Sequence, residues 1–246
     1  MKKFLPSLAI TAAALAGMGS AQAVVLTFDS PVDSTLAAFY PLLTHGDEFW
    51  TQGFFVDTFS TKAGAQAGDL VGSVIDGADL AAFCAGLVCP GGNTTKFMGI
   101  LNDGFLDIGT QNGSTFKLAG FDASFIAASG DPVLATALLL RVDGYNGATQ
   151  VGTQDFFLPG PVAGAYSFAS YSLAATFADT AVTELAIYGF ACTTATSCTR
   201  SLDKAQFAID NINAVNAVPE PAEWLLMGLG LLGVGAVVRR RQAAAA

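Results

Sequence analysis

Charge and histidine are both scarce in this sequence. Of 246 residues, 13% are charged, glutamate occurs four times and His45 is the one histidine. Residues 24–217 hold six Lys and Arg against 18 Asp and Glu, a net charge of −12. Because binding to phosphate groups depends on Lys and Arg, this deficit excludes a nucleic-acid partner. Any partner of this protein is therefore of a class that is not recognised by a surface rich in Lys and Arg.

The scarcity of histidine also argues against catalysis. A Ser–His–Asp arrangement could use only His45, which lies in a polar segment of residues 44–48 and is typical of a solvated loop. No Gly-x-Ser-x-Gly elbow, P-loop or His-Glu-x-x-His motif occurs, although each would mark a specific chemistry. We predict that the protein is not an enzyme and has no cofactor.

The N-terminus has the three parts of a secretory signal. Lys2 and Lys3 precede an apolar stretch of residues 4–18, and small residues follow at Ala21 and Ala23. A basic segment, an apolar segment and an Ala-x-Ala site are what signal peptidase recognises. We predict a signal peptide over residues 1–23, with cleavage after Ala23. The alternative is an N-terminal membrane anchor.

The C-terminus predicts a second membrane-directed segment. Proline residues at 219 and 221 interrupt any preceding strand, since proline lacks the amide donor. An uncharged run of fifteen residues, 224–238, then ends at three arginines, although a membrane span usually needs ~20 residues. We predict a short transmembrane helix at about 222–238, with the arginines on the cytoplasmic side. The alternative is a buried helix of the preceding domain.

The order of these parts resembles the PEP-CTERM sorting signal. It consists of a Pro-Glu-Pro element, a short Gly- and Leu-rich helix and an arginine cluster. The residues concerned are Val218, Pro219, Glu220, Pro221, Arg239, Arg240 and Arg241. The resemblance implies a Gram-negative bacterium and cleavage near Pro-Glu-Pro by an exosortase. It also implies transient anchoring in the inner membrane and release to the cell surface or the extracellular matrix. Residues 218–246 would thus form a removable tail.

Four cysteines lie in two close pairs, Cys84 with Cys89 and Cys192 with Cys198. An even number in an exported chain indicates disulfides. Three pairings are open, and we favour the local one. A zinc site is the alternative, but the gaps between the cysteines and the single histidine suit it poorly.

The segment between the two ends, residues 24–217, is predicted to be one all-β domain. Short apolar runs alternate with Gly, Asn and Asp turns, and 18 of the 19 Phe residues lie there, which suggests a sandwich or barrel. Asn102-Asp103-Gly104 is a hairpin signal between strands at 96–101 and 105–108. A strand at 134–142 is expected to end at Asp143-Gly144. The one predicted helix covers residues 79–87.

A motif near the end of this domain carries a second resemblance. Gln206, Phe207 and Asp210 resemble the Gln-Phe-x-x-Asp motif of a PEP-CTERM subfamily. The same segment is similar to the closing strand of galactose-binding-like jelly rolls, which implies a jelly-roll-like β-sandwich. By the two-residue period, Asp210 shares a face with Ile212 near the core. A buried carboxylate there needs hydrogen-bond donors or a cation.

Two kinds of binding site are suggested by the domain. Trp50, with Asp47 or Glu48 nearby, suits the stacking and hydrogen bonding of a sugar. The alternative is that Trp50 belongs to the core. Asp103, Asp107 and Asp210 offer the oxygen ligands that a structural calcium would use, or simply serve turns and solubility.

These features predict a non-enzymatic, exported protein of the cell surface or matrix. Its partners would be signal peptidase, an exosortase and extracellular polysaccharide, with the membrane contacted through the C-terminal helix before processing. One alternative is a secreted polysaccharide-acting enzyme, which would need a cleft with two carboxylates. The other is a purely structural or adhesive surface protein.

Overall fold

The computed structural model describes one compact unit between Ala23 and Asn216. The described residues are 23–30, 39–110, 112–128, 137–194, 197–199 and 204–216. The predicted signal peptide, the sorting tail and its helix at about 222–238 lie outside them. Within the described ranges, no helix has the length and apolar character needed to cross a membrane.

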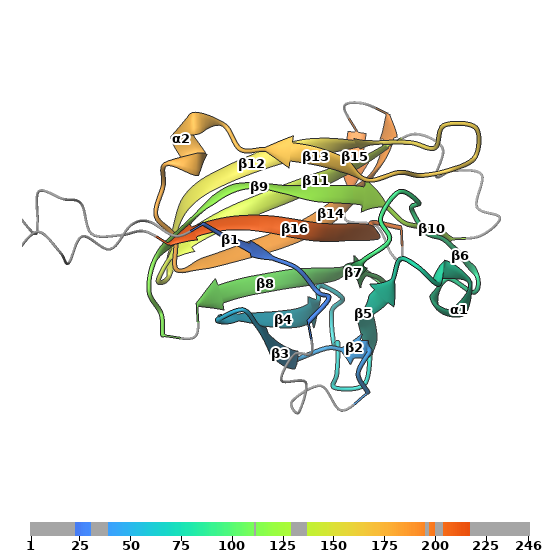
Figure 1. Cartoon of the computed structure of the whole chain (residues 1–246), viewed down its shortest axis with the longest axis horizontal. Helices are drawn as coiled ribbons and strands as arrows, with labels where there is room; N and C mark the ends of the chain where they lie inside the picture. The colour runs from blue at the N-terminus through green and yellow to red at the C-terminus, as the bar shows by residue number, and fades with distance from the viewer. Residues whose placement is uncertain are drawn as a thin grey trace, which may run out of the picture. The chain divides into compact units, whose positions relative to one another are not determined.

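Two antiparallel sheets form the sandwich that the sequence predicts (Figure 1). Sheet A comprises, in order, β13 (Ala169–Ser172), β9 (Phe116–Phe125), β16 (Phe207–Asn216), β7 (Lys96–Ile100), β5 (Leu70–Asp76) and β2 (Leu42–Thr44), with β1 (Ala23–Leu26) paired to β16. Sheet B comprises β12 (Thr149–Pro159), β11 (Ala137–Asn146), β14 (Glu184–Thr194), β8 (Gly104–Thr110), β4 (Phe54–Ser60) and β3 (Asp47–Thr51), with β15 (Ser197–Thr199) paired to β14.

Alternation along each strand creates the core between the sheets. In β8, for example, Leu106 and Ile108 are buried while Phe105 and Asp107 are half-buried on the other side, as the two-residue period requires. The same core contains Phe49 and Phe207, which are fully buried. Burying each such ring stabilises the fold by ~1.5–3 kcal/mol, so the phenylalanine content serves mainly this core.

A second, smaller apolar cluster lies on the other side of sheet A. It brings Phe97 of β7 and Ala208 of β16 together with Ile75 and Ile126. The segment that covers it contains α1 (Leu80–Phe83) and β6 (Leu87–Val88), which pairs with β10 (Ala127–Ala128). Sheet A is therefore buried on both faces at this end.

Both local disulfides are present, as predicted. Cys84–Cys89 closes the segment of α1 and β6, and Cys192–Cys198 joins β14 to β15. The helix is shorter than the predicted 79–87, because the chain turns at Gly86 with a positive φ of 81° and then enters β6.

Three local predictions need correction. Asn102 and Asp103 form a tight turn with positive φ, but this turn leads from β7 in sheet A to β8 in sheet B, so it is not a hairpin. The strand predicted to end at Asp143-Gly144 continues as β11 to Asn146. On β16, Ile212 faces the core, away from Asp210, because a bulge at positive-φ Asn211 shifts the alternation.

Candidate functional site

The outer face of sheet B, turned away from the core, gathers acidic and aromatic side chains. Its middle row runs across three strands: Glu48 of β3 lies opposite Asp57 of β4, which lies opposite Asp107 of β8. Glu184 of β14 pairs with Gly109, two residues beyond Asp107. We call Glu48, Asp57, Asp107 and Glu184 the carboxyl row; all four are half-buried.

The acids of the carboxyl row interact with one another. Glu48 raises the pKa of Asp57, and Glu184 raises the pKa of Asp107. Burial, followed by repulsion from Glu48, raises the pKa of Asp57 to about 7. Burial, followed by repulsion from Glu184, raises the pKa of Asp107 to about 8. Near neutral pH the row therefore retains protons that ordinary aspartates have lost.

Aromatic side chains lie on both sides of the carboxyl row. On one side, Trp50 is opposite Phe55, with the rings edge to face and their centroids 6.0 Å apart. Phe55 covers Gly109, where any side chain would collide with its ring. On the other side, Phe59 stacks on Phe105 with centroids 5.5 Å apart. An acidic strip thus runs between two apolar ones.

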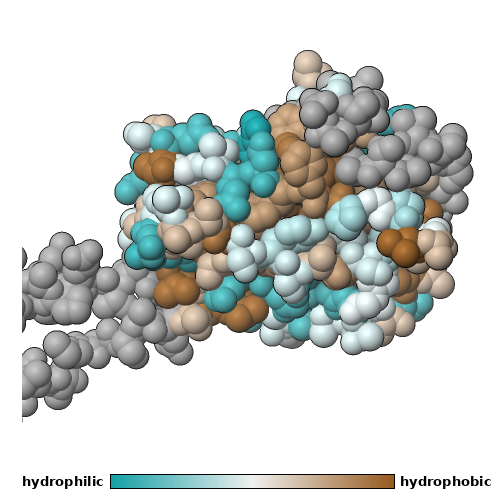
Figure 2. All heavy atoms as spheres, turned by 90° about the horizontal axis from the view of Figure 1, so that it is seen from above, coloured by the Kyte–Doolittle hydropathy of each residue, from teal (hydrophilic) through white to brown (hydrophobic). Residues whose placement is uncertain are grey.

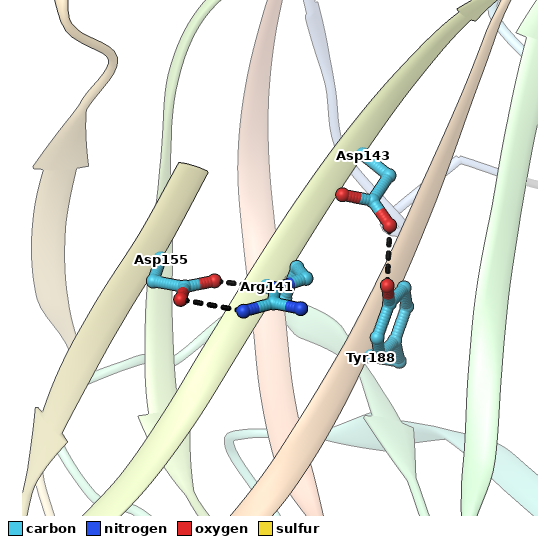
Figure 3. A network of polar contacts seen from close by, with 4 residues as sticks. All are labelled: Arg141, Asp143, Asp155 and Tyr188. Carbon is cyan, nitrogen blue, oxygen red and sulfur yellow. Dashed lines mark hydrogen bonds and ion pairs between the residues drawn. The ribbon is translucent and has the colours of Figure 1, made fainter. Parts of the chain in front are cut away.

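A polar network continues this face across β11, β12 and β14 (Figure 3). Arg141 donates two hydrogen bonds to Asp155, from Nε at 2.6 Å and Nη2 at 2.7 Å, and its guanidinium lies over the Phe190 ring. The Tyr188 hydroxyl donates to Asp143. Arg141 is the one basic residue in the described strands of sheet B, and Asp155 already compensates its charge.

The face also carries exposed apolar surface near the edge of sheet B. Phe157 and Val151 of β12 are 53% and 39% exposed. Seen from above, the side of the molecule near β12 and β13 shows hydrophobic side chains gathered beside hydrophilic ones (Figure 2). Stacking of apolar ring faces and hydrogen bonding to polar groups are therefore available on one surface.

The two residues predicted for a sugar do not share a face. Trp50 is half-buried on the outer face of sheet B, whereas Asp47 points to the other side of β3 and is 8% exposed. Oδ2 of Asp47 accepts hydrogen bonds from the backbone N–H of Thr44 at 2.7 Å and from its hydroxyl at 2.9 Å. Asp47 thus stabilises the turn before β3, and Glu48 takes its place beside Trp50.

His45 has a structural role. Its Nδ1 accepts a hydrogen bond from the Ser60 backbone N–H at 2.9 Å. Its ring meets Phe59 edge to face, with centroids 5.6 Å apart. These contacts connect the β2–β3 turn to the end of β4.

The three aspartates considered for calcium lie in different places. Asp103 is in the turn between the sheets, Asp107 is in the carboxyl row, and Asp210 is fully buried on β16 in sheet A. They cannot share an ion. Within the part of the chain that the structure describes, no three or more His, Cys, Asp or Glu residues are grouped to hold a metal.

One oxygen of Asp210 has hydrogen-bond donors, whereas the other, Oδ1, is buried without a partner. Its Oδ2 accepts hydrogen bonds from Asn93 Nδ2 at 2.7 Å and Thr95 Oγ1 at 3.2 Å. Burial raises the pKa of Asp210 and these hydrogen bonds lower it, with the rise prevailing. The family motif residues Gln206 and Phe207 are buried as well. The motif therefore contributes to the fold of sheet A.

The sequence reasoning missed Asp57 and Glu184. It offered Glu48 as the alternative to Asp47 beside Trp50, and the two-residue spacing of Glu48 and Trp50, which puts them on one strand face, favours Glu48. The meeting of Asp57 with Asp107 depends on the pairing of β4 with β8, which the sequence does not encode locally.

Comparison with known families matches residues 217–241 to the PEP-CTERM protein-sorting motif. This confirms the motif predicted at Val218–Pro221 and Arg239–Arg241. The motif implies exosortase-dependent sorting of an exported protein with transient membrane anchoring. Among curated proteins, none matches the chain.

Three solved structures are similar in part. TmCBM61 in complex with β-1,4-galactotriose has 6% identity and a TM-score of 0.33, covering 65% of this chain and 88% of that one. The family 11 carbohydrate-binding module from Clostridium thermocellum, with a mixed-linked tetrasaccharide, has 10% identity and a TM-score of 0.30, covering 73% and 97%. The enzymatically active domain of bacteriophage CBA120 tailspike protein 4 has 10% identity and a TM-score of 0.29, covering 66% and 19%. These TM-scores carry no argument about a ligand.

Proposed function

We propose that this chain is a non-enzymatic protein of the cell surface or extracellular matrix of a Gram-negative bacterium, and that it binds extracellular polysaccharide through the outer face of sheet B. The observation that supports this is the carboxyl row between two strips of aromatic side chains. Sugar hydroxyls donate hydrogen bonds to carboxylates, and the apolar faces of sugar rings stack on aromatic rings. Both are offered by one sheet.

Delivery would follow from the two ends of the chain. Signal peptidase would remove residues 1–23, and an exosortase would cleave the tail near Pro219–Pro221 after a transient stay in the inner membrane. The resemblance at Gln206, Phe207 and Asp210 supports membership of the Gln-Phe-x-x-Asp subfamily, and the two antiparallel sheets are compatible with a galactose-binding-like jelly roll. Mass spectrometry of the surface-delivered protein tests this, since an intact end at Ala246 would contradict removal of the tail.

A binding role is favoured over catalysis by how the acids are used. Asp57 lies opposite another acid, Glu48, and Glu184 raises the pKa of Asp107, while His45 is held by Ser60. We therefore expect no new reducing ends when the protein is incubated with a polysaccharide that it binds. Their appearance at a rate that depends on Asp107 would favour the polysaccharide-acting enzyme instead.

The decisive test is a tryptophan substitution in the full chain, purified in mild detergent. Trp50→Ala should weaken polysaccharide binding about tenfold, because one stacking contact contributes on the order of 1 kcal/mol. Phe39→Ala is the matched control, since Phe39 is 63% exposed and precedes β2 of sheet A. Unchanged affinity in Trp50→Ala, or an equal loss in Phe39→Ala, would contradict the proposed face.

A further inference from the structure

The carboxyl row concentrates negative charge without a compensating base. Glu48 lies directly opposite Asp57, and Asp57 opposite Asp107, although like charges at such positions destabilise a sheet. Every charged group that shifts the pKa of Asp57 or Asp107 is another carboxyl. Arg141, the one base of the described strands in this sheet, is already bound to Asp155.

Other acids of the domain have partners of their own. Asp155 has Arg141, and Asp210 has Asn93 and Thr95. On the outer face of sheet B, Oδ1 of Asp57, Asp107 and Asp143 is buried without a hydrogen-bond partner, as is Oδ1 of Asp210 in sheet A. Asp143 and Asp210 do accept hydrogen bonds on Oδ2. Asp143 is 4% exposed and reaches the carboxyl row through Ala186, which is opposite both Asp143 and Asp107.

The shape of the row favours an organic cation over a metal ion. Glu48, Asp57 and Asp107 stand in a line on successive strands about 4.8 Å apart, and Glu184 is offset from that line by two residues. The four acids therefore do not form a cage of converging ligands. The aromatic strips on both sides suit a positively charged group as well, because ring faces attract ammonium ions. An amino sugar presents an ammonium group and an apolar ring face together.

Resting on the proposed function, we infer that the polysaccharide bound by the outer face of sheet B carries free amino groups, and that an ammonium group lies on the carboxyl row. The net charge of −12 for residues 24–217 adds long-range attraction for such a polymer. Acetylation of the amine removes its charge and leaves the sugar ring unchanged. It therefore separates the contribution of the ammonium charge from that of ring stacking.

The test compares two oligosaccharides of equal length, one of glucosamine and one of N-acetylglucosamine, by calorimetry on the full chain in mild detergent. At slightly acidic pH and low salt, the glucosamine oligomer should bind at least about tenfold more tightly, and added salt should reduce the difference. In the free protein Asp107, with a pKa of about 8, holds its proton at this pH, and a bound ammonium group favours its ionised form. Asp107→Asn keeps the shape of the side chain but cannot ionise, so it should remove most of this preference. Asp179→Asn is the matched control, since Asp179 lies just after α2 (Ala175–Ala178) and its side chain is 84% exposed.

Each outcome separates the inference from the function on which it rests. Equal affinity for the two oligomers, still lost in Trp50→Ala, would overturn the amino-group inference and leave the proposed function intact. Binding of the acetylated oligomer only after addition of calcium would overturn it in favour of a metal on the carboxyl row. Failure of these oligomers and of all other polysaccharides to bind would overturn both.

Discussion

The outer faces of the two sheets differ, because among the described residues another segment of the chain covers that of sheet A and none covers that of sheet B. Over sheet A, the disulfide-closed segment of α1 and β6 buries Phe97 and Ala208 in a second apolar cluster. Over sheet B, the described residues form no comparable cluster, and the face displays the carboxyl row with half-buried Trp50 and Phe105. The cover over sheet A stabilises the fold, whereas the face of sheet B keeps groups that a binding partner can use.

Two buried acids show the same difference at the level of single residues. Asp210 in sheet A and Asp107 in sheet B both have raised pKa values, and burial is the largest cause for each. Asp210 is surrounded by donors from Asn93 and Thr95, while Asp107 faces another acid, Glu184. The hydrogen bonds to Asp210 stabilise the fold, whereas the repulsion between Asp107 and Glu184 destabilises it.

The largest expected effect on stability comes from replacing Asp210, which accepts hydrogen bonds from Asn93 and Thr95. Asp210→Ala should lower the free energy of unfolding by about 2–4 kcal/mol, because it removes the acceptor of half-buried Asn93 and leaves a cavity at a fully buried position. Urea unfolding followed by circular dichroism measures the loss. Asp210→Asn keeps the shape and an acceptor, so it should cost less. A fully stable Asp210→Ala variant would show that the donors on Asn93 and Thr95 contribute little.

Removing the Cys84–Cys89 disulfide from the segment of α1 and β6, which covers sheet A, should have a smaller effect on stability. Replacing Cys84 and Cys89 together by alanine should cost about 2 kcal/mol, on the chain-entropy estimate for so short a loop. Hydrogen exchange should accelerate in β5 and β7 and stay unchanged in β4 and β8, which serve as the internal control. Equal acceleration in both sheets would mean that the cover stabilises the whole sandwich.

The smallest expected effect is the pH dependence due to the carboxyl row. The unfolded pKa is 3.8, and the folded values of Asp57 and Asp107 are about 7 and about 8. The folded state thus binds more protons between these limits, and stability falls as pH rises from about 4 to about 8.

Melting temperatures measured across this pH range should decrease with rising pH. The variant carrying Asp57→Asn and Asp107→Asn should flatten part of the decrease, by no more than about 1 kcal/mol because the groups are partly exposed and screened. Asp210 contributes the remainder with the same sign. Stability that increases with pH would contradict the repulsion described here.

The sequence predicted what depends on short spacing. The strands predicted at 96–101 and 105–108 lie close to the bounds of β7 and β8, and the two cysteine pairs indicated both disulfides. Choosing Asp47 as the neighbour of Trp50 was an error of parity, since residues three apart lie on opposite faces of a strand. The turn at Asn102 was foreseen, but its role in joining two sheets depends on partners far along the chain, as does the meeting of Asp57 with Asp107.

The place of β16 has a consequence for the order of events during export. This strand lies between β9 and β7, and β1 also pairs with it, yet it is the last strand before the sorting motif at 217–241. The strands β1, β7 and β9 therefore cannot pair with β16 until nearly the whole domain has crossed the membrane. Completion of sheet A and arrival of the sorting tail are therefore nearly simultaneous, and a chain interrupted within β16 would reach neither its fold nor its destination.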